Sequence, residues 1–303
     1  MRDIFSEGLL YLDLLEMYGS SHLVAELCDV AQSNAYRGAT SCAKLLSLDL
    51  QKQDGRYVAT SNQDVLADLR RVNQRLRLRQ SGRLRGLIDP HFPIASLPSA
   101  SADLQLLPKT WLDLATTLQF LEQAILDLAV VRGLELSYDC PTPTGIPPKG
   151  RPWRQGSFMA TVLHEEPLRL FVAAGHPLLS AGALAPADLA AYPSPDLERS
   201  DQACWRSRLR PHGLCTHKLS LSRLQPGQWE QQVLQDGWIL PSCSTSMEAH
   251  LGRPEQGGYT VLPYQLQLTE RAVLLVPAND AAEPRLKTLL APLLNPSLQL
   301  ISA

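Results

Sequence analysis

Residues 18–45 read YGSSHLVAELCDVAQSNAYRGATSCAKL, two short helical patterns separated by a tight turn at Cys28-Asp29-Val30. In the second pattern Ala35, Ala39 and Cys42 share one face at helical spacing. The opposite face carries hydrogen-bond donors and long side chains, namely Gln32, Ser33, Asn34, Tyr36, Arg37, Thr40 and Lys44. Two short helices joined by a tight turn, with small residues inside and donors outside, are typical of a helix-turn-helix.

The next residues, LSLDLQKQDGRYVAT (46–60), predict a hairpin. Strands are expected at Leu48–Gln51 and Tyr57–Thr60 around an Asp54-Gly55 turn, which is a strong hairpin signal. A helix-turn-helix followed by a basic hairpin is a winged helix, here over residues 1–61. Its expected DNA contacts are Gln32, Ser33, Asn34, Tyr36 and Arg37 from the second helix and Lys52, Arg56 and Thr60 from the wing.

A helix is predicted at about 61–80, within a linker over residues 62–82. Val65, Leu69, Val72 and Leu76 are spaced 4, 3, 4 along it, which is a short coiled-coil seam. This seam either packs on the protein's own core or pairs with a second chain. The high charge of the helix favours dimerisation.

This N-terminal segment resembles the LysR-type transcriptional regulators. The resemblance rests on residues 18–45, on GRYVAT at the wing (55–60) and on the long linker helix. Ala31 and Tyr36 stand where the family usually has Ser, and Gly38 lies inside the recognition helix. The resemblance implies a recognition helix that enters the major groove of double-stranded DNA, and a dimer or tetramer.

Residues 83–303 alternate strand-like and helix-like patterns, which predicts an α/β domain. ILDLAVVRG (125–133) and LHEEPLRLFVAAGHPLL (163–179) resemble two motifs of the same family. The resemblance implies a periplasmic-binding-protein-like effector domain of two subdomains. Subdomain I is expected at about 83–162 and 271–303 and subdomain II at about 163–270. The crossover strands are expected at about 163–173 and 271–277.

A small-molecule effector of this fold would bind between the subdomains, near strand ends. The polar residues expected there are Asp89, His91, Lys109, Thr110, Ser194 and Asp196. Lys109 follows the strand LQLL and is the best candidate for holding a small anion. Three prolines within residues 89–103 exclude a long helix after Ile88. We therefore expect weak or absent metabolite binding, with regulation through oligomerisation or a protein partner.

Charge patterning gives a further clue. The net charge is −2, but seven arginines fall between Arg70 and Arg85 without an acid. This run is either a solvated helix face or a basic strip beside a phosphate backbone or an acidic partner. Composition alone does not choose between these two interpretations.

Several function classes are not indicated. The six cysteines include no CxxC pair, and no metal site or cofactor is expected. His176 and His164 lie in no catalytic motif, so we expect no enzyme, and His176 is interpreted as a turn residue. The sequence shows no signal peptide and no membrane span, which predicts a cytoplasmic protein. The leading hypothesis is a LysR-type DNA-binding regulator. The alternative is a repurposed relative that acts through protein–protein contacts with weak or no DNA binding.

Overall fold

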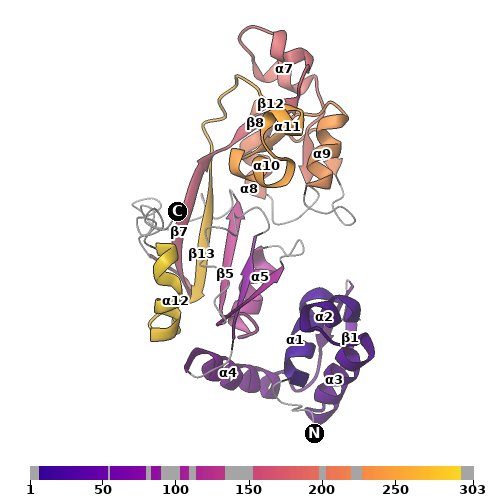
Figure 1. The fold of residues 1–303 in the computed structure, drawn as a ribbon, viewed down its shortest axis with the longest axis vertical. Helices are drawn as coiled ribbons and strands as arrows, with labels where there is room; N and C mark the ends of the chain where they lie inside the picture. Colours follow the sequence, from indigo (N-terminus) through magenta and orange to yellow (C-terminus); the bar gives the residue numbers. More distant parts are fainter. Residues whose placement is uncertain are drawn as a thin grey trace.

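The computed structural model describes residues 7–53, 55–79, 83–89, 103–108, 114–133, 153–197, 203–219 and 227–294. The molecule is elongated, with a helical N-terminal unit at one end and a small α/β unit at the other (Figure 1). A six-stranded sheet lies between them (Figure 1). The predicted winged helix and two-subdomain α/β architecture is confirmed.

The N-terminal unit is a winged helix. It contains α1 (Leu9–Tyr18), α2 (Ser21–Cys28), α3 (Gln32–Leu45), β1 (Leu50–Gln53) and β2 (Arg56–Ala59). The second helix of the predicted helix-turn-helix is therefore confirmed as α3. The two wing strands lie nearer the turn than the sequence predicted, because Gln53 and Arg56 pair directly across residues 54–55. Gly55 takes the positive φ of 82° that such a tight turn requires.

Helix α4 (Gln63–Arg79) links the winged helix to the sheet. Its buried face is largely polar, with Arg70, Gln74 and Arg77 inside beside Leu66 and Leu78. This corrects both interpretations for three of the seven arginines, since Arg70, Arg77 and Arg85 are buried and paired with acids of this chain. The local pattern did not reveal this, because those acids come from distant parts of the sequence. The other four arginines of the run are exposed.

Subdomain I is built on the sheet, whose strand order is β4-β3-β5-β13-β7-β6. Its elements are β3 (Leu84–Ile88), β4 (Leu104–Pro108), α5 (Leu114–Glu122), β5 (Leu128–Gly133), β6 (Trp153–Gln155), β7 (Phe158–Pro167), β13 (Thr269–Pro277) and α12 (Pro284–Leu294). Alternate residues face opposite sides. Leu87, Val131 and Leu275 pack with α5 and the winged helix, whereas Ile88 and Leu274 pack with α12.

Subdomain II carries a three-stranded sheet of order β11-β8-β12 and a parallel pair, β10-β9. The strands are β8 (Arg169–Ala173), β9 (Pro195–Leu197), β10 (His217–Leu219), β11 (Leu240–Ser242) and β12 (Tyr259–Val261). The helices are α7 (Pro186–Ala190), α8 (Ala203–Leu209), α9 (Gln228–Gln235), α10 (Ser244–Leu251) and α11 (Pro254–Gly257). The sequence analysis did not predict α10, α11, β6 or β9.

Two segments join the subdomains. Strand β7 leaves subdomain I and continues into β8, while β13 returns antiparallel to β7. The Leu168 amide donates to the Leu268 carbonyl at 2.8 Å where they cross. The two segments therefore cross at Leu168 and Leu268, a few residues after position 163, where the first crossover strand was predicted to begin.

Among the described residues, no helix is long and apolar enough to cross a membrane.

Candidate nucleic-acid interface

The turn between α2 and α3 fixes the angle of the recognition helix. Asp29 closes α2 in the left-handed conformation with φ 51°, and its N–H donates to the end of α2. On the inner side, Gly38 gives α3 close contact with α1. A Cβ at Gly38 would lie 2.5 Å from the Tyr11 ring. Glycine is unfavourable inside a helix, but it is required at position 38 because a larger residue would clash with Tyr11.

The outer face of α3 carries the predicted DNA-contacting side chains. Gln32 Nε2 donates to Ser21 Oγ at 2.9 Å, which ties the start of α3 to α2. Arg37 donates to the Ser33 carbonyl at 3.1 Å and to Asn34 Oδ1 at 3.0 Å. Tyr36 is 43% exposed. The structure thus brings these five residues together on one accessible surface.

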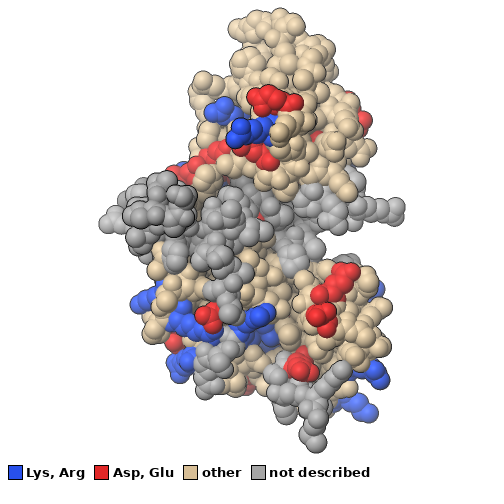
Figure 2. All heavy atoms as spheres, in the orientation of Figure 1, with Lys and Arg blue, Asp and Glu red and all other residues tan. Residues whose placement is uncertain are grey.

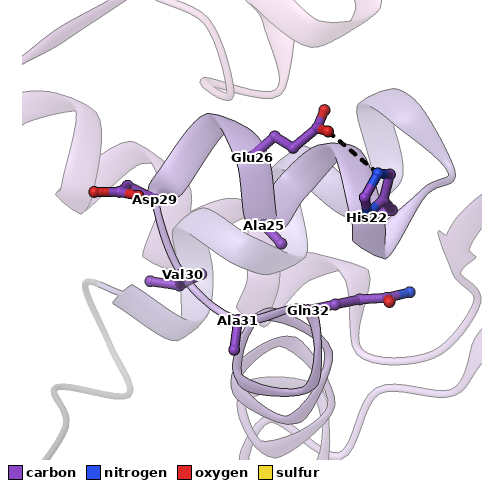
Figure 3. Close-up of a pocket in the computed structure, with 7 residues that line it drawn as sticks. All are labelled: His22, Ala25, Glu26, Asp29, Val30, Ala31 and Gln32. Carbon is purple, nitrogen blue, oxygen red and sulfur yellow. Dashed lines mark ion pairs between the residues drawn. The ribbon is translucent and has the colours of Figure 1, made fainter.

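A hollow lies beside the N-terminus of α3 (Figure 3). It is lined by His22, Ala25, Glu26, Asp29, Val30, Ala31 and Gln32. Ala31 occupies the N-cap and provides no side-chain cap, whereas the Asn34 amide donates to the Ala31 carbonyl at 2.8 Å. Of the first-turn amides, those of Gln32 and Ser33 could therefore donate to an outside acceptor such as a phosphate oxygen. Two carboxylates border the same hollow, and Glu26 pairs with His22 at 3.2 Å. These acids oppose the approach of a phosphate.

The wing contributes three predicted residues, which play different roles. Lys52 is exposed and its Nζ lies 5.7 Å from the Tyr57 ring centroid. Thr60 closes the base of the hairpin, where its hydroxyl donates to the Asp49 carbonyl at 3.2 Å. Arg56 is half-buried and donates to Thr116 Oγ1 of α5 at 3.3 Å. Arg56 is therefore engaged by subdomain I rather than free at the wing.

The surface around the recognition helix is electrostatically mixed. Figure 2 shows basic and acidic side chains interspersed over the half of the molecule that carries the winged helix. Burial raises the pKa values of Cys28 and Cys42 to about 11, so both thiols near this surface stay protonated at neutral pH. The face seen in Figure 2 therefore does not present a broad positive field.

The predicted seam lies mainly on the surface of the chain. Val65, Val72 and Leu76 are 46%, 53% and 48% exposed. Leu69 is only partly exposed and packs against the core shared by the winged helix and the sheet. The exposed part of the seam is an apolar stripe, and Leu69 serves the protein's own core as well.

Three of the six predicted effector residues, Asp89, Ser194 and Asp196, are described by the structure. His91, Lys109 and Thr110 lie outside the described residues. Asp89 is buried at the end of β3, where its amide donates to the Val130 carbonyl. In subdomain II the Ser194 amide donates to the Thr216 hydroxyl oxygen at 3.0 Å, and Asp196 binds Arg206 at 2.5 Å and Arg210 at 3.3 Å. These contacts give Ser194 and Asp196 a structural role.

His176 is a structural turn residue, as interpreted. It is buried, its Nδ1 accepts from the Leu178 amide, and its Nε2 lies 3.2 Å from the Gly237 carbonyl. His164 lies 3.4 Å from Glu166 on β7. Within the described ranges, no group of three or more His, Cys, Asp or Glu side chains is placed to hold a metal ion.

The sequence analysis missed Asp13 and Glu16 on α1. Both are buried and bind Arg70 of α4. A signal was present, because two carboxylates three residues apart interrupt an otherwise apolar helix, LLYLDLLEMY. Acids on the buried face of a helix indicate buried cationic partners.

Comparison with known proteins confirms the architecture. No protein-family model matches the chain, and no curated protein is significantly similar to it. Among solved structures, a variant of full-length OxyR from Pseudomonas aeruginosa is similar, with TM-score 0.55, 16% identity and coverage of 97% of this chain and 95% of that one. ArgP from Mycobacterium tuberculosis gives TM-score 0.51, 13% identity and 95% coverage of both chains. A probable transcriptional regulator from Pseudomonas aeruginosa gives TM-score 0.50, 14% identity and coverage of 94% and 96%. The chain therefore has the fold of these proteins over nearly its whole length, which is the architecture implied by its resemblance to the LysR-type regulators.

Proposed function

We propose that the protein is a LysR-type transcription regulator that binds double-stranded DNA through α3. The observation that carries this proposal is the accessible polar face of α3, set by the α2–α3 turn and followed by a wing. Gln32 and Ser33 lie at the N-terminal end of α3, the part of a recognition helix that contacts base edges in the major groove. Asn34, Tyr36 and Arg37 extend this surface by one helical turn.

Gel shift with the DNA upstream of the protein's own coding region tests this proposal. We expect a shifted complex that survives an excess of unrelated DNA. Gln32→Ala should weaken that complex by roughly 5- to 150-fold, the range for one bidentate base contact, and leave non-specific binding unchanged. Gln231→Ala, an exposed glutamine of α9, is the matched control. Absence of any complex with this DNA, even at low salt, would contradict the proposal.

We propose further that two chains pair through α4. Val65, Val72 and Leu76 form the apolar stripe, and Leu69 lies between them at its inner edge. Beside the stripe the exposed charges are segregated, with Asp64 and Asp68 near the N-terminus and Arg71 and Arg75 nearer the C-terminus, whereas Arg79 pairs with Glu283 of its own chain at 3.2 Å. An antiparallel pair of helices would bring the acids of one chain opposite the arginines of the other. A dimer, or a tetramer built from it, follows from this arrangement.

For the effector-like domain we propose weak or absent metabolite binding. Ser194 and Asp196 already have partners within subdomain II, which supports this part of the proposal. Thermal-shift screening of organic acids, sugar phosphates and nucleotides is the test. A specific stabilisation that disappears in Lys109→Ala would instead establish a metabolite sensor. As a proposed DNA-binding regulator, the protein would act in the cytoplasm.

A specific observation favours a second candidate, a protein that acts through protein–protein contacts. Arg56 of the wing is bound to Thr116 of α5, and Glu26 and Asp29 flank the start of α3. Both features lower the attraction to a phosphate backbone. Thr116→Val, which releases Arg56, discriminates between the candidates. A DNA-binding protein should bind DNA at least as tightly after this change, whereas no complex in either form would favour the second candidate.

A further inference from the structure

Six charged side chains are buried where the winged helix meets subdomain I. The acids are Asp13 and Glu16 of α1 and Asp127, which precedes β5; the bases are Arg70 and Arg77 of α4 and Arg85 of β3. Their formal charges cancel, three against three. Because an unpaired charge in such a place is strongly unfavourable, the pairing pattern matters more than the number of ion pairs.

Asp13 is the link between the two units. Its Oδ1 accepts from Arg70 Nε at 2.8 Å and its Oδ2 accepts from Arg85 Nη1 at 2.6 Å. Glu16 accepts a second hydrogen bond from Arg70 at 2.6 Å. One carboxylate of the winged helix, only 1% exposed, therefore binds both the linker helix and the first strand of subdomain I.

Asp127 completes the network from the other side. It receives two hydrogen bonds from Arg77, at 2.8 and 2.9 Å, and one at 2.8 Å from the backbone amide of Arg85. Arg85 thus uses its side chain toward Asp13 and its main chain toward Asp127. Arg85 alone therefore links Asp13 of α1 to Asp127 of subdomain I.

Apolar packing continues across the same junction. Leu12 and Leu15 of α1 belong to one buried cluster with Leu87 of β3, Phe120 of α5 and Ile125. At the edge, the contact between Arg56 and Thr116 joins the wing to α5. The winged helix and subdomain I therefore share a continuous core in addition to the charges.

Apolar contacts alone would tolerate a small rotation of one unit on the other, whereas charge pairs would not. A rotation that kept the six groups buried but broke their pairing would leave charges without partners. The apolar cluster therefore provides the attraction, and the charges select one orientation.

We propose that the winged helix is docked on subdomain I of its own chain in one orientation selected by Asp13, Arg70 and Arg85. A change in subdomain I is then transmitted within the same chain, from β3 through Arg85 and Asp13 to α1, which packs against α3. The consequence for regulation rests on the proposed function, whereas the docking itself does not depend on DNA binding.

Hydrogen exchange measured by mass spectrometry on the full chain tests the docking without DNA. Arg85→Gln removes the charge that reaches Asp13. We expect the amides of α1 to exchange about tenfold faster or more, the factor for losing one buried charge-assisted hydrogen bond. The amides of β13 and β8 should keep their wild-type protection. Arg154→Gln, an exposed arginine of subdomain I, should leave all segments unchanged.

Unchanged exchange of α1 in Arg85→Gln would overturn the proposal. An equal increase in α1, β13 and β8 would also overturn it, because that pattern means general destabilisation rather than release of one unit. If Arg85→Gln does not fold, Arg56→Ala provides the same comparison at the edge of the junction. It should increase exchange in α1 and the wing by a smaller factor, and no change there would contradict the proposal. Loss of DNA binding with an intact exchange pattern would affect only the proposed function.

Discussion

Replacing Arg37 by Ala tests whether α3 lies against a phosphate backbone. Arg37 is exposed, and its two hydrogen bonds go to Ser33 and Asn34 of its own helix. The substitution therefore removes a surface charge with little effect on packing, and the thermal midpoint should stay close to that of the wild type. Any large change in DNA affinity can then be attributed to a lost contact.

The expected magnitude follows from counterion release. Each phosphate contact adds about 0.9 to the slope of log affinity against log salt, so a dimer with two copies of Arg37 loses about 1.8. When salt is raised from 50 to 200 mM, both proteins lose affinity, and the fold-loss should be about 12 times smaller for the variant than for the wild type. Fluorescence anisotropy with labelled DNA over this salt range measures both slopes.

Two results would refute the reasoning. Identical slopes for the wild type and Arg37→Ala would show that Arg37 makes no phosphate contact. The same flattening in Arg154→Ala, an exposed arginine far from α3 in the sequence, would show that net charge rather than contact geometry is responsible. A change of about 0.9 instead of 1.8 would indicate that only one chain contacts the DNA.

Three further predictions address the wing, the stripe and subdomain II. Replacing Lys52 and Arg56 together by Ala should reduce specific and non-specific affinity alike, and a loss of specific binding only, seen by competition gel shift, would mean that the wing reads sequence. Val72→Asp should shift the protein toward monomer in light scattering, because it places a charge in the apolar stripe. Unlike Leu69→Asp, it should not disturb the chain's own core. An unchanged molecular mass would contradict pairing through this seam. Burial raises the pKa of Glu230 from 4.5 to about 7, so the folded state retains a proton that the unfolded chain releases, and the free energy of unfolding should fall as pH rises through this window. Glu230→Gln should remove up to about 3 kcal/mol of that fall in urea unfolding at pH 5 and 8, and an equal pH dependence in both proteins would refute the assignment.

The sequence predicted the recognition helix well because its determinants are local. Ala35, Ala39 and Cys42 repeat at helical spacing and are buried as expected, and the Asp54-Gly55 pair marked the hairpin. These signals depend on residues within one or two turns of each other. The fold could therefore be predicted from short patterns together with the family resemblance.

The partners of the buried arginines could not be predicted in the same way. Asp13 lies 57 residues from Arg70 and 72 from Arg85, so no local pattern connects them. Arg56 was predicted as a free DNA contact for the same reason, since its partner Thr116 is 60 residues away. The internal contacts of Ser194 and Asp196 could not be predicted either, because strand ends alone do not indicate which polar groups already have partners within a subdomain.

The position of β13 has a consequence for biosynthesis. This strand lies inside the six-stranded sheet, paired with β5 on one side and β7 on the other, yet it comes after all the other strands of the described residues. During synthesis β5 and β7 emerge more than a hundred residues before the segment that separates them. Until residue 277 has left the ribosome, both strands present unpaired edges, which is the situation that favours aggregation and slow folding. Truncation before β13 should consequently yield an insoluble product, and chaperone capacity should limit the yield of the full chain.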